Sequence, residues 1–392
     1  MTLVEPSWDQ ARECAANFGA KLATKTESAK VTRVEVVDLR SALDRVLAED
    51  ALSLVELPTY ETSAMDGYAV SGSGPWKIIG EVKAGAPYKG KLHSGEALGI
   101  ATGAVIPEGT FGILRWEDAK VNGLDLTGET NERKDFRPAA EEAKLGELLI
   151  KSGTSLSPGA LGLLAASGFD QVEVFVKPKV ALLLLGDEIQ TLGLPTGGLV
   201  RDSLGPQLPG WLERLGCEVV NVQYVSDVLE LTIAAIEKSS KSADIIVTTG
   251  GTADGPRDFL HESIAKLNGV VHVNKVAVRP GHPQLLGEVN EKPLIGLPGN
   301  PQSAVVALLT LGKPLIDALF GRKLNELPLI SSDDQFDAAP GFTRLVLGTL
   351  DGRRFSMGKH LGSAMLRSLA HADGFAVCTN PPTTLRWLGL PT

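Results

Sequence analysis

Two glycine-bearing turns, each directly after an apolar run, are the parts of this sequence best suited to chemistry on an anionic ligand. In the first, the apolar residues 245–247 lead into Thr-Thr-Gly-Gly at 248–251. In the second, residues 294–295 lead into Gly-Leu-Pro-Gly-Asn-Pro at 296–301, and an apolar helix is expected from about Ser303. Beyond the strand ends of open α/β sheets, glycine lets the backbone approach a ligand and helix N-termini attract anions. The pair favours a phosphate-bearing ligand over two ordinary tight turns.

Acidic residues stand where catalysis at strand ends would need them: Asp66, Asp187, Glu188, Asp202, Asp227, Asp254 and Asp258. Carboxylates near a glycine turn can hold Mg²⁺, which then bridges oxygens of the substrate. The sequence therefore allows a magnesium site among these acids, but it does not say which of them bind the metal.

Three basic or titratable residues, Lys275, Arg279 and His282, lie in the segment NKVAVRPGHP, shortly after a predicted strand. Lys275 and Arg279 are four residues apart, so an extended strand would carry both on one face. Two cations on one face suit a phosphate or an oxyanion such as molybdate. A solvated basic edge on an acidic protein would have the same sequence. His282 has no second histidine at metal-ligand spacing.

Polar residues also flank two turns in a β-like region. Asp66 and Tyr68 stand on either side of Gly67, which is expected to allow a sharp turn. Thr102 follows a strand-like run, where its hydroxyl could donate to a ligand oxygen or cap the turn. Ordinary turn roles are the simpler explanation at both places.

Composition narrows the class of protein. The 392 residues, 43% of them hydrophobic, favour about two to four domains with a real core. The net charge of -9 argues against a nucleic-acid binder that works by bulk positive charge. There is no HExxH, GxSxG or Walker A lysine loop, which weakens zinc-protease, serine-hydrolase and P-loop interpretations.

Cysteine usage and the N-terminus indicate the compartment. Cys14, Cys217 and Cys378 lie far apart and form no CxxC pair, which fits a reducing compartment and no cysteine-built zinc site. The N-terminus is polar and acidic rather than that of a signal peptide, and no apolar run is expected to reach the length of a membrane span. We expect a cytoplasmic protein with neither nucleic-acid nor membrane partners.

The first part of the chain reads as two interleaved segments. Residues 1–57 and 137–177 form a discontinuous N-terminal and linker domain. Helices are expected there over residues 7–19, 39–47 and 157–166, with Ser7 and Ser157 as N-caps. Residues 58–136 alternate short β-type pieces with Gly and Pro, which is typical of a small β-rich domain.

The rest of the chain has a different pattern of apolar segments. Residues 178–324 alternate strands and helices, and this β-α-β rhythm predicts a doubly wound parallel sheet covered on both faces. Residues 325–392 are again β-like, with a short helix near 363–369. The fold class is therefore α/β plus β in a multidomain chain.

Several motifs occur in an order that identifies a family: LPTYETSAMDGYAV, ATGAVIPEGT, FRPAAEEAKLGELLIKSGTSLSP, LLLLGDEI, TTGG, KVAVRPGHP and GLPGNPQSA, then FTRLVLG and GSAMLRSLAHADG. Together they resemble the molybdopterin molybdenumtransferase family, MoeA-like and related to the E domain of gephyrin. The resemblance runs from about Ser7 to Gly374. It implies four domains, a MogA-like α/β domain among them, and a homodimer.

The resemblance also implies an activity, namely insertion of molybdate into adenylylated molybdopterin with Mg²⁺-dependent loss of AMP. It implies partners that include molybdopterin adenylyltransferase and molybdoenzymes. The positions that match functional positions of the motifs are Asp66, Thr102, Glu142, Glu188, Asp227, Asp258, Lys275, Pro298, Pro301 and Arg344.

Roles follow from the same resemblance. Asp66, Glu188, Asp227 and Asp258 are the expected catalytic residues, and the last three are the expected metal ligands. The expected substrate-binding residues are Thr102, Gly250, Gly251, Thr252, Lys275, Arg279, His282, Pro298, Gly299, Asn300, Pro301, Ser303 and Arg344.

The chain departs from the family in one loop. The family commonly reads TTGGVSVGDYD where this chain reads TTGGTADGPRD, with Ala253 and Pro256 at changed positions. This loop resembles that of the MogA-like molybdopterin adenylyltransferases, so adenylyl transfer from ATP to molybdopterin is an alternative. A non-catalytic paralogue that binds pterin or molybdate is another. Arg279 and His282 stand where the family usually has lysines.

Overall fold

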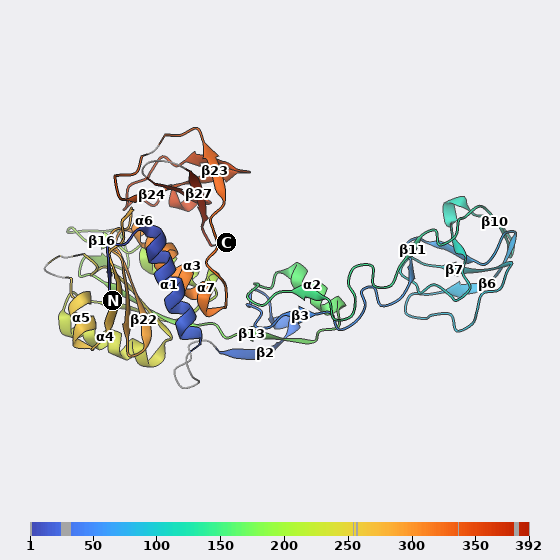
Figure 1. Ribbon diagram of the computed structural model, residues 1–392, viewed down its shortest axis with the longest axis horizontal. Coiled ribbons are helices and arrows are strands. Elements are labelled where there is room, and N and C mark those ends of the chain that lie inside the picture. The colour runs from blue at the N-terminus through green and yellow to red at the C-terminus, as the bar shows by residue number, and fades with distance from the viewer. Residues whose placement is uncertain are drawn as a thin grey trace. The chain divides into compact units, whose positions relative to one another are not determined.

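The chain forms two compact units in a computed structural model (Figure 1). The structure describes residues 2–24, 33–253, 255, 258–335, 337–379 and 384–391. The larger unit contains Met1–Glu35 and Val174–Thr392, and the smaller unit is Val36–Glu173. The chain passes between them at β2 (Val34–Asp38) and β13 (Gln171–Phe175). The four-domain boundaries stay a prediction.

The larger unit is built on a seven-stranded sheet. In spatial order its strands are β1 (Leu3–Val4), β19 (Val270–Asn274), β21 (Leu285–Val289), β22 (Lys292–Leu297), β18 (Ile245–Thr249), β14 (Lys179–Leu185) and β17 (Glu218–Val225). Neighbouring strands of the described sheet run parallel, except where β21 pairs with β19 and β22. The predicted fold class is confirmed, with β21 as an antiparallel member.

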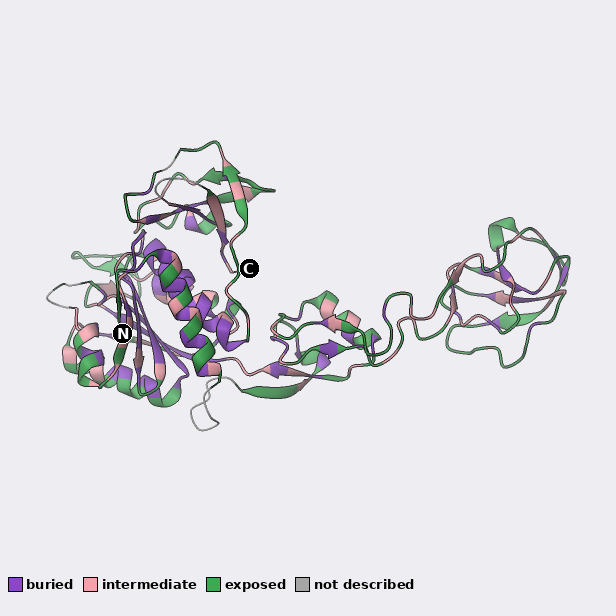
Figure 2. Cartoon of the chain, viewed as in Figure 1, coloured by how far each residue is buried: buried purple, intermediate pink, exposed green. Residues whose placement is uncertain are grey.

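Helices cover both faces of this sheet (Figure 1). On one face, α4 (Leu229–Ser242) and α5 (Leu260–Lys266) share a buried cluster with Leu183 of β14. On the other face lies α3 (Leu204–Arg214), beside Leu184. Successive strand residues point to opposite faces, so Leu183 and Leu184 serve the two layers. Buried residues accordingly concentrate in the sheet between the helices (Figure 2).

The α3 face also carries a long helix, which we call the core helix (Pro301–Leu319). It comprises α6 (Pro301–Ala307), a π-helical turn (Leu308–Gly312) and α7 (Lys313–Leu319). This helix is apolar and long enough to cross a membrane, which corrects the expectation that no run reaches that length. Of its apolar window, 89% is buried inside the structure, as in the core helix of a globular fold.

The N-terminal helix α1 (Trp8–Ala23) begins where the sequence predicts, with Ser7 as its N-cap. The Ser7 hydroxyl accepts from the Gln10 N–H, and the Gln10 side chain accepts from the Ser7 N–H at 3.0 Å. The helix packs closely on α7, since a Cβ at Gly19 would lie 2.3 Å from the Leu315 carbonyl oxygen. The first helix is therefore part of the core of the larger unit.

A closed β-barrel completes the larger unit. The sequence predicted β structure for this C-terminal segment, and the closure is a finding of the structure. Its ring is β24 (Thr343–Asp351), β25 (Arg354–Met357), β23 (Leu329–Ser332), β27 (Leu385–Gly389) and β26 (Gly374–Cys378), which pairs back to β24. The short strand β20 (Val278–Arg279) adds to β24 in parallel. A two-stranded arm, β15 (Ile189–Gln190) and β16 (Val200–Arg201), follows β14.

One predicted helix of the barrel segment is wrong. Instead of a helix over 363–369, the structure has a single 3-10 turn, Leu369–His371. The reason is tertiary. Gln302 donates to the carbonyl oxygens of His360, Ser363 and Met365, so groups that a local helix would use are bonded elsewhere.

The smaller unit contains a six-stranded sheet, as expected for its β-rich part. The order is β8 (Gly112–Arg115), β5 (Gly67–Val70), β7 (Glu96–Ile100), β6 (Trp76–Val82), β10 (Asp125–Thr127) and β9 (Lys120–Asn122). Two short pairs accompany it, β11 (Phe136–Arg137) with β4 (Thr62–Ser63), and β12 (Leu148–Ile150) with β3 (Ala51–Leu52). A 3-10 turn, Trp116–Asp118, follows β8. Helix α2 (Pro158–Ala166) begins after the predicted cap Ser157.

Two local predictions in the smaller unit are wrong. The helix expected over 39–47 is only a 3-10 turn, Leu39–Ser41, because residues 44–47 pair with the backbone of Thr154 and Leu156. Gly67 is not in a sharp turn but begins strand β5. Only glycine fits at this position, because a Cβ there would lie 2.2 Å from the Leu114 carbonyl oxygen.

This close approach gives a stability prediction with a matched control in the facing strand. Gly67→Ala should destabilise the smaller unit by about 1–3 kcal/mol, because the β5–β8 pairing must open to admit the methyl group. Gly99→Ala should be nearly neutral, since its Cβ would meet no atom closer than 3.6 Å. Hydrogen exchange of peptides from residues 67–115 measures both. Equal exchange rates in the two variants would contradict the explanation.

Candidate functional site

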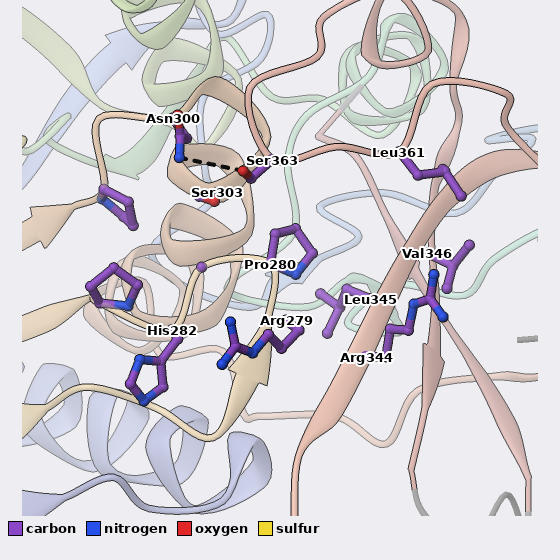
Figure 3. A pocket seen from close by; sticks show the side chains of 13 residues that line it. Arg279, Pro280, His282, Asn300, Ser303, Arg344, Leu345, Val346, Leu361 and Ser363 are labelled. Atoms are coloured by element: carbon purple, nitrogen blue, oxygen red, sulfur yellow. Dashed lines mark hydrogen bonds between the residues drawn. The ribbon is translucent and has the colours of Figure 1, made fainter. Parts of the chain in front are cut away.

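A cavity of about 380 Å³ lies in the larger unit where the sheet domain meets the barrel (Figure 3). We call it the arginine cavity. Its lining residues are Arg279, Pro280, Gly281, His282, Pro283, Pro298, Asn300, Ser303, Arg344, Leu345, Val346, Leu361 and Ser363. Three elements therefore build it: the segment after β20, the turn that precedes the core helix, and strand β24 with its following loop.

The two arginines are brought together by strand pairing. β20 and β24 run parallel, with Arg279 in register with Arg344. The Thr343 N–H donates to the Ala277 carbonyl oxygen at 2.9 Å and extends this ladder. Arg344 Nη1 donates to the Asp337 carbonyl oxygen at 3.0 Å, which orients the guanidinium, and it forms no ion pair among the described residues. The cavity thus carries two permanent cations on adjacent strands.

The loop after β20 is held from beneath by a buried amide. Gln284 is 1% exposed, and its Nε2 donates to the Gly281 carbonyl oxygen at 2.8 Å. Gly281 has φ 97°, and a Cβ there would lie 3.2 Å from the Ser303 carbonyl oxygen. His282 lines the cavity, and its Nε2 lies 2.8 Å from Glu5 Oε1. The glycine and the amide together fix the loop against the core helix.

The core helix begins at the cavity wall, directly after the Pro298–Pro301 turn. Its N-terminal end directs backbone N–H groups and the positive end of the helix dipole toward this region. Asn300 Nδ2 donates to Ser363 Oγ at 3.3 Å (Figure 3). Gln302, 1% exposed, donates from Nε2 to the carbonyl oxygens of His360 at 3.0 Å and Met365 at 2.7 Å. These bonds tie the barrel loop to the helix.

The first glycine turn of the sequence, at 248–251, follows the neighbouring strand β18. Gly250 and Gly251 have φ 78° and 66°, which only glycine adopts without strain. A Cβ on Gly250 would also lie 2.9 Å from the Leu185 carbonyl oxygen, at the end of β14. Thr252, which follows, is buried. Both glycines are half-buried, and the Gly250 N–H donates to the Leu297 carbonyl oxygen at 2.9 Å. That this turn binds a ligand stays a prediction.

The acids are distributed along the same carboxyl edge. Glu188, Asp227 and Asp258 follow the ends of β14, β17 and β18, yet the described residues contain no group of three or more His, Cys, Asp or Glu that could hold a metal ion. Asp227 N–H donates to Asp187 Oδ1 at 3.4 Å. Asp258 Oδ2 accepts from the Gly255 N–H at 3.0 Å. Asp254, Pro256 and Arg257 of the divergent loop lie outside the described residues.

One acid of the edge has a structural role. Asp202 Oδ1 accepts from the N–H groups of Leu204 and Gly205 at the start of α3. Its Oδ2 accepts from the Tyr224 hydroxyl at 2.7 Å. Partial burial raises the pKa of Tyr224, and this bond to Asp202 raises it further. Asp202 therefore starts a helix and anchors a strand residue.

Comparisons with known proteins place this geometry in a family. A profile of the MoeA N-terminal region (domain I and II) matches residues 7–168, and one of a probable molybdopterin binding domain matches 181–318. The molybdopterin molybdenumtransferase of Haemophilus influenzae is 33% identical over 301 residues, 74% of each chain. That of Staphylococcus aureus (strain COL) is 31% identical, over 79% of this chain and 78% of its own.

A solved structure agrees. The molybdopterin biosynthesis MoeA protein from Pyrococcus horikosii matches with a TM-score of 0.73 and 28% identity, over 98% of this chain and 97% of that one. The chain belongs to the molybdopterin molybdenumtransferase family. The resemblance stated from the motifs is thereby confirmed, and with it an enzyme of molybdenum-cofactor biosynthesis.

The larger unit brings together only part of the family motif residues. Arg279, His282, Pro298, Asn300, Ser303 and Arg344 all line the arginine cavity. Gly299 and Pro301 lie in the same turn without lining it. Lys275 does not line the cavity either. The assumption of one extended strand fails there, because β19 ends at Asn274 and Lys275 has φ 61°.

The smaller unit brings two other motif residues together. The Thr102 N–H donates to Asp66 Oδ1 at 2.7 Å, across 36 positions of sequence. Both residues are exposed, at the facing ends of the antiparallel strands β5 and β7. The backbone of Thr102, rather than its hydroxyl, makes this contact. Glu142 is exposed elsewhere in the unit, with its N–H bonded to the Leu57 carbonyl oxygen.

Sequence reasoning missed several residues of the arginine cavity. Leu345, Val346, Leu361 and Ser363 line it, and Gln302 holds its barrel loop. Leu345 and Val346 lie within FTRLVLG, and Ser363 lies within GSAMLRSLAHADG. Both motifs contributed to the family resemblance, so they were the sequence feature from which these lining residues could have been predicted.

The two buried glutamines give a paired prediction. Gln302→Leu should speed hydrogen exchange in residues 358–372 by about tenfold or more, because two buried carbonyl oxygens lose their donor. Gln284→Leu should loosen residues 279–283 instead, since it frees the Gly281 carbonyl oxygen. Each variant is the control for the other. Uniform loosening of both segments in both variants would contradict these separate roles.

Proposed function

We propose that this enzyme inserts molybdate into adenylylated molybdopterin, with Mg²⁺-dependent release of AMP. The proposal rests on one arrangement above all. Two register-paired arginines and the start of a long helix face a single cavity in a protein of net charge -9. Cations and helix N-termini attract oxyanions, so local positive potential at this place favours molybdate or phosphate.

In this proposal the arginine cavity receives molybdate. Arg279 and Arg344 supply charge and directed N–H donors, which suit a tetrahedral oxyanion better than a point charge does. Ser303, Asn300 and Ser363 add polar groups that can orient its oxygens. His282 stands at a lysine position of the family. Its Nε2 is engaged by Glu5, so in this proposal it contributes less to ligand binding than the arginines do.

The adenylylated pterin binds in this proposal along the carboxyl edge of the sheet. The backbone of Gly250 and Gly251 offers close approach to an anionic tail, and Thr252 follows as a polar residue of the same turn. Lys275 adds a cation near the end of β19. Asp66 and Thr102 form a second polar site in the smaller unit, which we assign to substrate binding and turnover.

The acids at this edge fit Mg²⁺ in one specific way. Mg²⁺ is commonly held by one or two carboxylates together with substrate phosphates, rather than by a complete protein cage. Glu188, Asp227 and Asp258 offer the right donor chemistry without forming a closed cluster among the described residues. We propose that they hold the ion with the substrate. When bound, Mg²⁺ would neutralise charge on the phosphoanhydride that is cleaved.

Other properties extend this proposal by resemblance. A homodimer, a cytoplasmic location and contacts with molybdopterin adenylyltransferase and molybdoenzymes are proposed on family grounds. In this proposal, cleavage of the phosphoanhydride depends mainly on positioning and charge stabilisation, because the carboxylates act by holding Mg²⁺ and the arginines by binding the oxyanion.

The activity prediction concerns AMP. Purified protein with adenylylated molybdopterin, molybdate and Mg²⁺ should release AMP, and chelation of Mg²⁺ should stop it. Arg344→Gln should lower kcat/KM by about 10²-fold, because one directed donor to the oxyanion is lost. Arg353→Gln, which removes the same charge outside the cavity, should leave kcat/KM unchanged. Chromatographic measurement of the AMP released tests each of these expectations.

Two outcomes would overturn this assignment. Formation of adenylylated molybdopterin from ATP and molybdopterin, without AMP release in the first assay, would identify an adenylyltransferase. Pterin binding with neither product would identify a non-catalytic binding protein.

A separate prediction concerns the carboxylate at the end of the glycine turn. Asp258→Ala should abolish turnover while the free energy of unfolding changes by no more than about 1 kcal/mol, because the side-chain bond seen among the described residues is one to the Gly255 N–H of a polar turn. Asp258→Asn keeps an acceptor for the Gly255 N–H and removes the charge, so it should fold equally well and remain inactive. Full activity in either variant would show that Asp258 is not a catalytic residue.

A further inference from the structure

A second cavity, of about 430 Å³, lies on the C-terminal barrel and shares no lining residue with the arginine cavity. We call it the barrel cavity. Strands β24 and β25 contribute Thr349 and Ser356, and the segment that follows contributes Lys359, Arg367 and Ser368. Two histidines, His360 and His371, also line it, and no carboxylate does. This lining is cationic in a protein whose net charge is -9.

The two permanent cations of this lining are not neutralised by the protein. In the described part of the chain, neither Lys359 nor Arg367 has a side-chain hydrogen bond or an ion pair, and both are exposed. Other barrel arginines do form ion pairs, as Arg386 does with Asp9 at 2.9 Å and 3.0 Å. Two uncompensated cations facing one cavity create a local positive potential that attracts an anion.

Acids close in sequence are committed to other contacts. Asp334 Oδ2 accepts from the Met357 N–H at 2.7 Å, and Asp373 Oδ2 accepts from the Leu350 N–H at 2.9 Å. These bonds engage one oxygen of each carboxylate with a backbone N–H, and neither Asp334 nor Asp373 lines the cavity. The positive lining is therefore a property of the folded barrel.

The wall of this cavity is fixed before any ligand binds. Ser368 Oγ accepts from the His360 N–H at 2.9 Å, and the Gly358 N–H donates to the Leu347 carbonyl oxygen at 2.9 Å. A Cβ on Gly358 would lie 2.9 Å from Ser368 Oγ, so the two segments approach as closely as glycine permits. Gln302 holds the His360 carbonyl oxygen from the other side. A fixed wall loses little entropy on binding.

We propose that the barrel cavity binds a tetrahedral oxyanion, either free or as the phosphate group of a small molecule. Arg367 supplies a fork of donors and Lys359 a mobile charge, the two means by which proteins bind phosphate. The hydroxyls of Thr349, Ser356 and Ser368 are further donors around it. The volume exceeds that of a single ion and falls in the range of small-molecule sites. This site is independent of the proposed reaction.

One methionine provides a probe within the cavity. Met357 lines it, and the chain has only 4 methionines. The full chain carrying ¹³C-methyl methionine is titrated with inorganic phosphate at constant ionic strength, with chloride as the reference salt. The Met357 signal, assigned with Met357→Leu, should shift saturably, while the signal of Met65 in the smaller unit should not move.

Charge variants decide the assignment. Lys359→Gln and Arg367→Gln should each weaken the phosphate-dependent Met357 shift by about tenfold in Kd. Arg353→Gln removes a charge outside the cavity and should leave it unchanged. The proposal is overturned if chloride gives the same shift, if no saturation occurs, or if Lys359→Gln and Arg367→Gln titrate like Arg353→Gln.

Further titrations identify the form of the oxyanion. Tighter binding of AMP than of inorganic phosphate supports a phosphorylated small molecule, whereas equal or tighter binding of phosphate or molybdate supports a free oxyanion. Arg344→Gln, which lies in the arginine cavity, should leave every one of these Met357 shifts intact. This readout is binding rather than turnover, so it is separate from the test of AMP release.

Discussion

The pairing of two short backbone segments is the constraint on which the candidate site depends. β20 contains only Val278 and Arg279, yet its register with β24 sets Arg279 beside Arg344 and joins the sheet domain to the barrel. Like charges on adjacent strands repel, so this arrangement lowers stability unless an anion or water compensates it. The repulsion falls at the place where we propose that an oxyanion binds. Strand register, rather than either arginine alone, therefore creates the cavity.

Much of the architecture follows from patterns that act locally. The sequence predicted strand β14 from its apolar run, and it predicted the caps Ser7 and Ser157. Both predictions succeed because these features depend on residues close in sequence. The turn at Gly250 and Gly251 was predictable because a backbone with positive φ favours glycine. The helix expected over residues 39–47 failed because its amphipathic pattern was satisfied by pairing with residues more than a hundred positions away.

Of the candidate site, the sequence predicted only those residues that lie in recognisable family motifs. Arg344 was found through a family pattern, since nothing in its local sequence says that it meets Arg279. Gln302 and Ser363 meet through bonds across about sixty positions, and no periodicity signals such a contact. Lys275 was misjudged because evenly spaced residues share a face only on an unbroken strand, and the strand ends one residue earlier. Residue types predicted the chemistry, and long-range pairing decided which of them meet.

The burial of Trp8 against Thr310 has a consequence for biosynthesis. These partners are 302 positions apart, so helix α1 leaves the ribosome long before the helix that covers it has been made. At about 5–20 residues per second, the delay is on the order of 15–60 s. During that time the face of α1 that packs on the core helix lacks this partner and is open to other contacts. Slow translation of the second half of the gene would lengthen this exposure and raise the risk of aggregation in the cell.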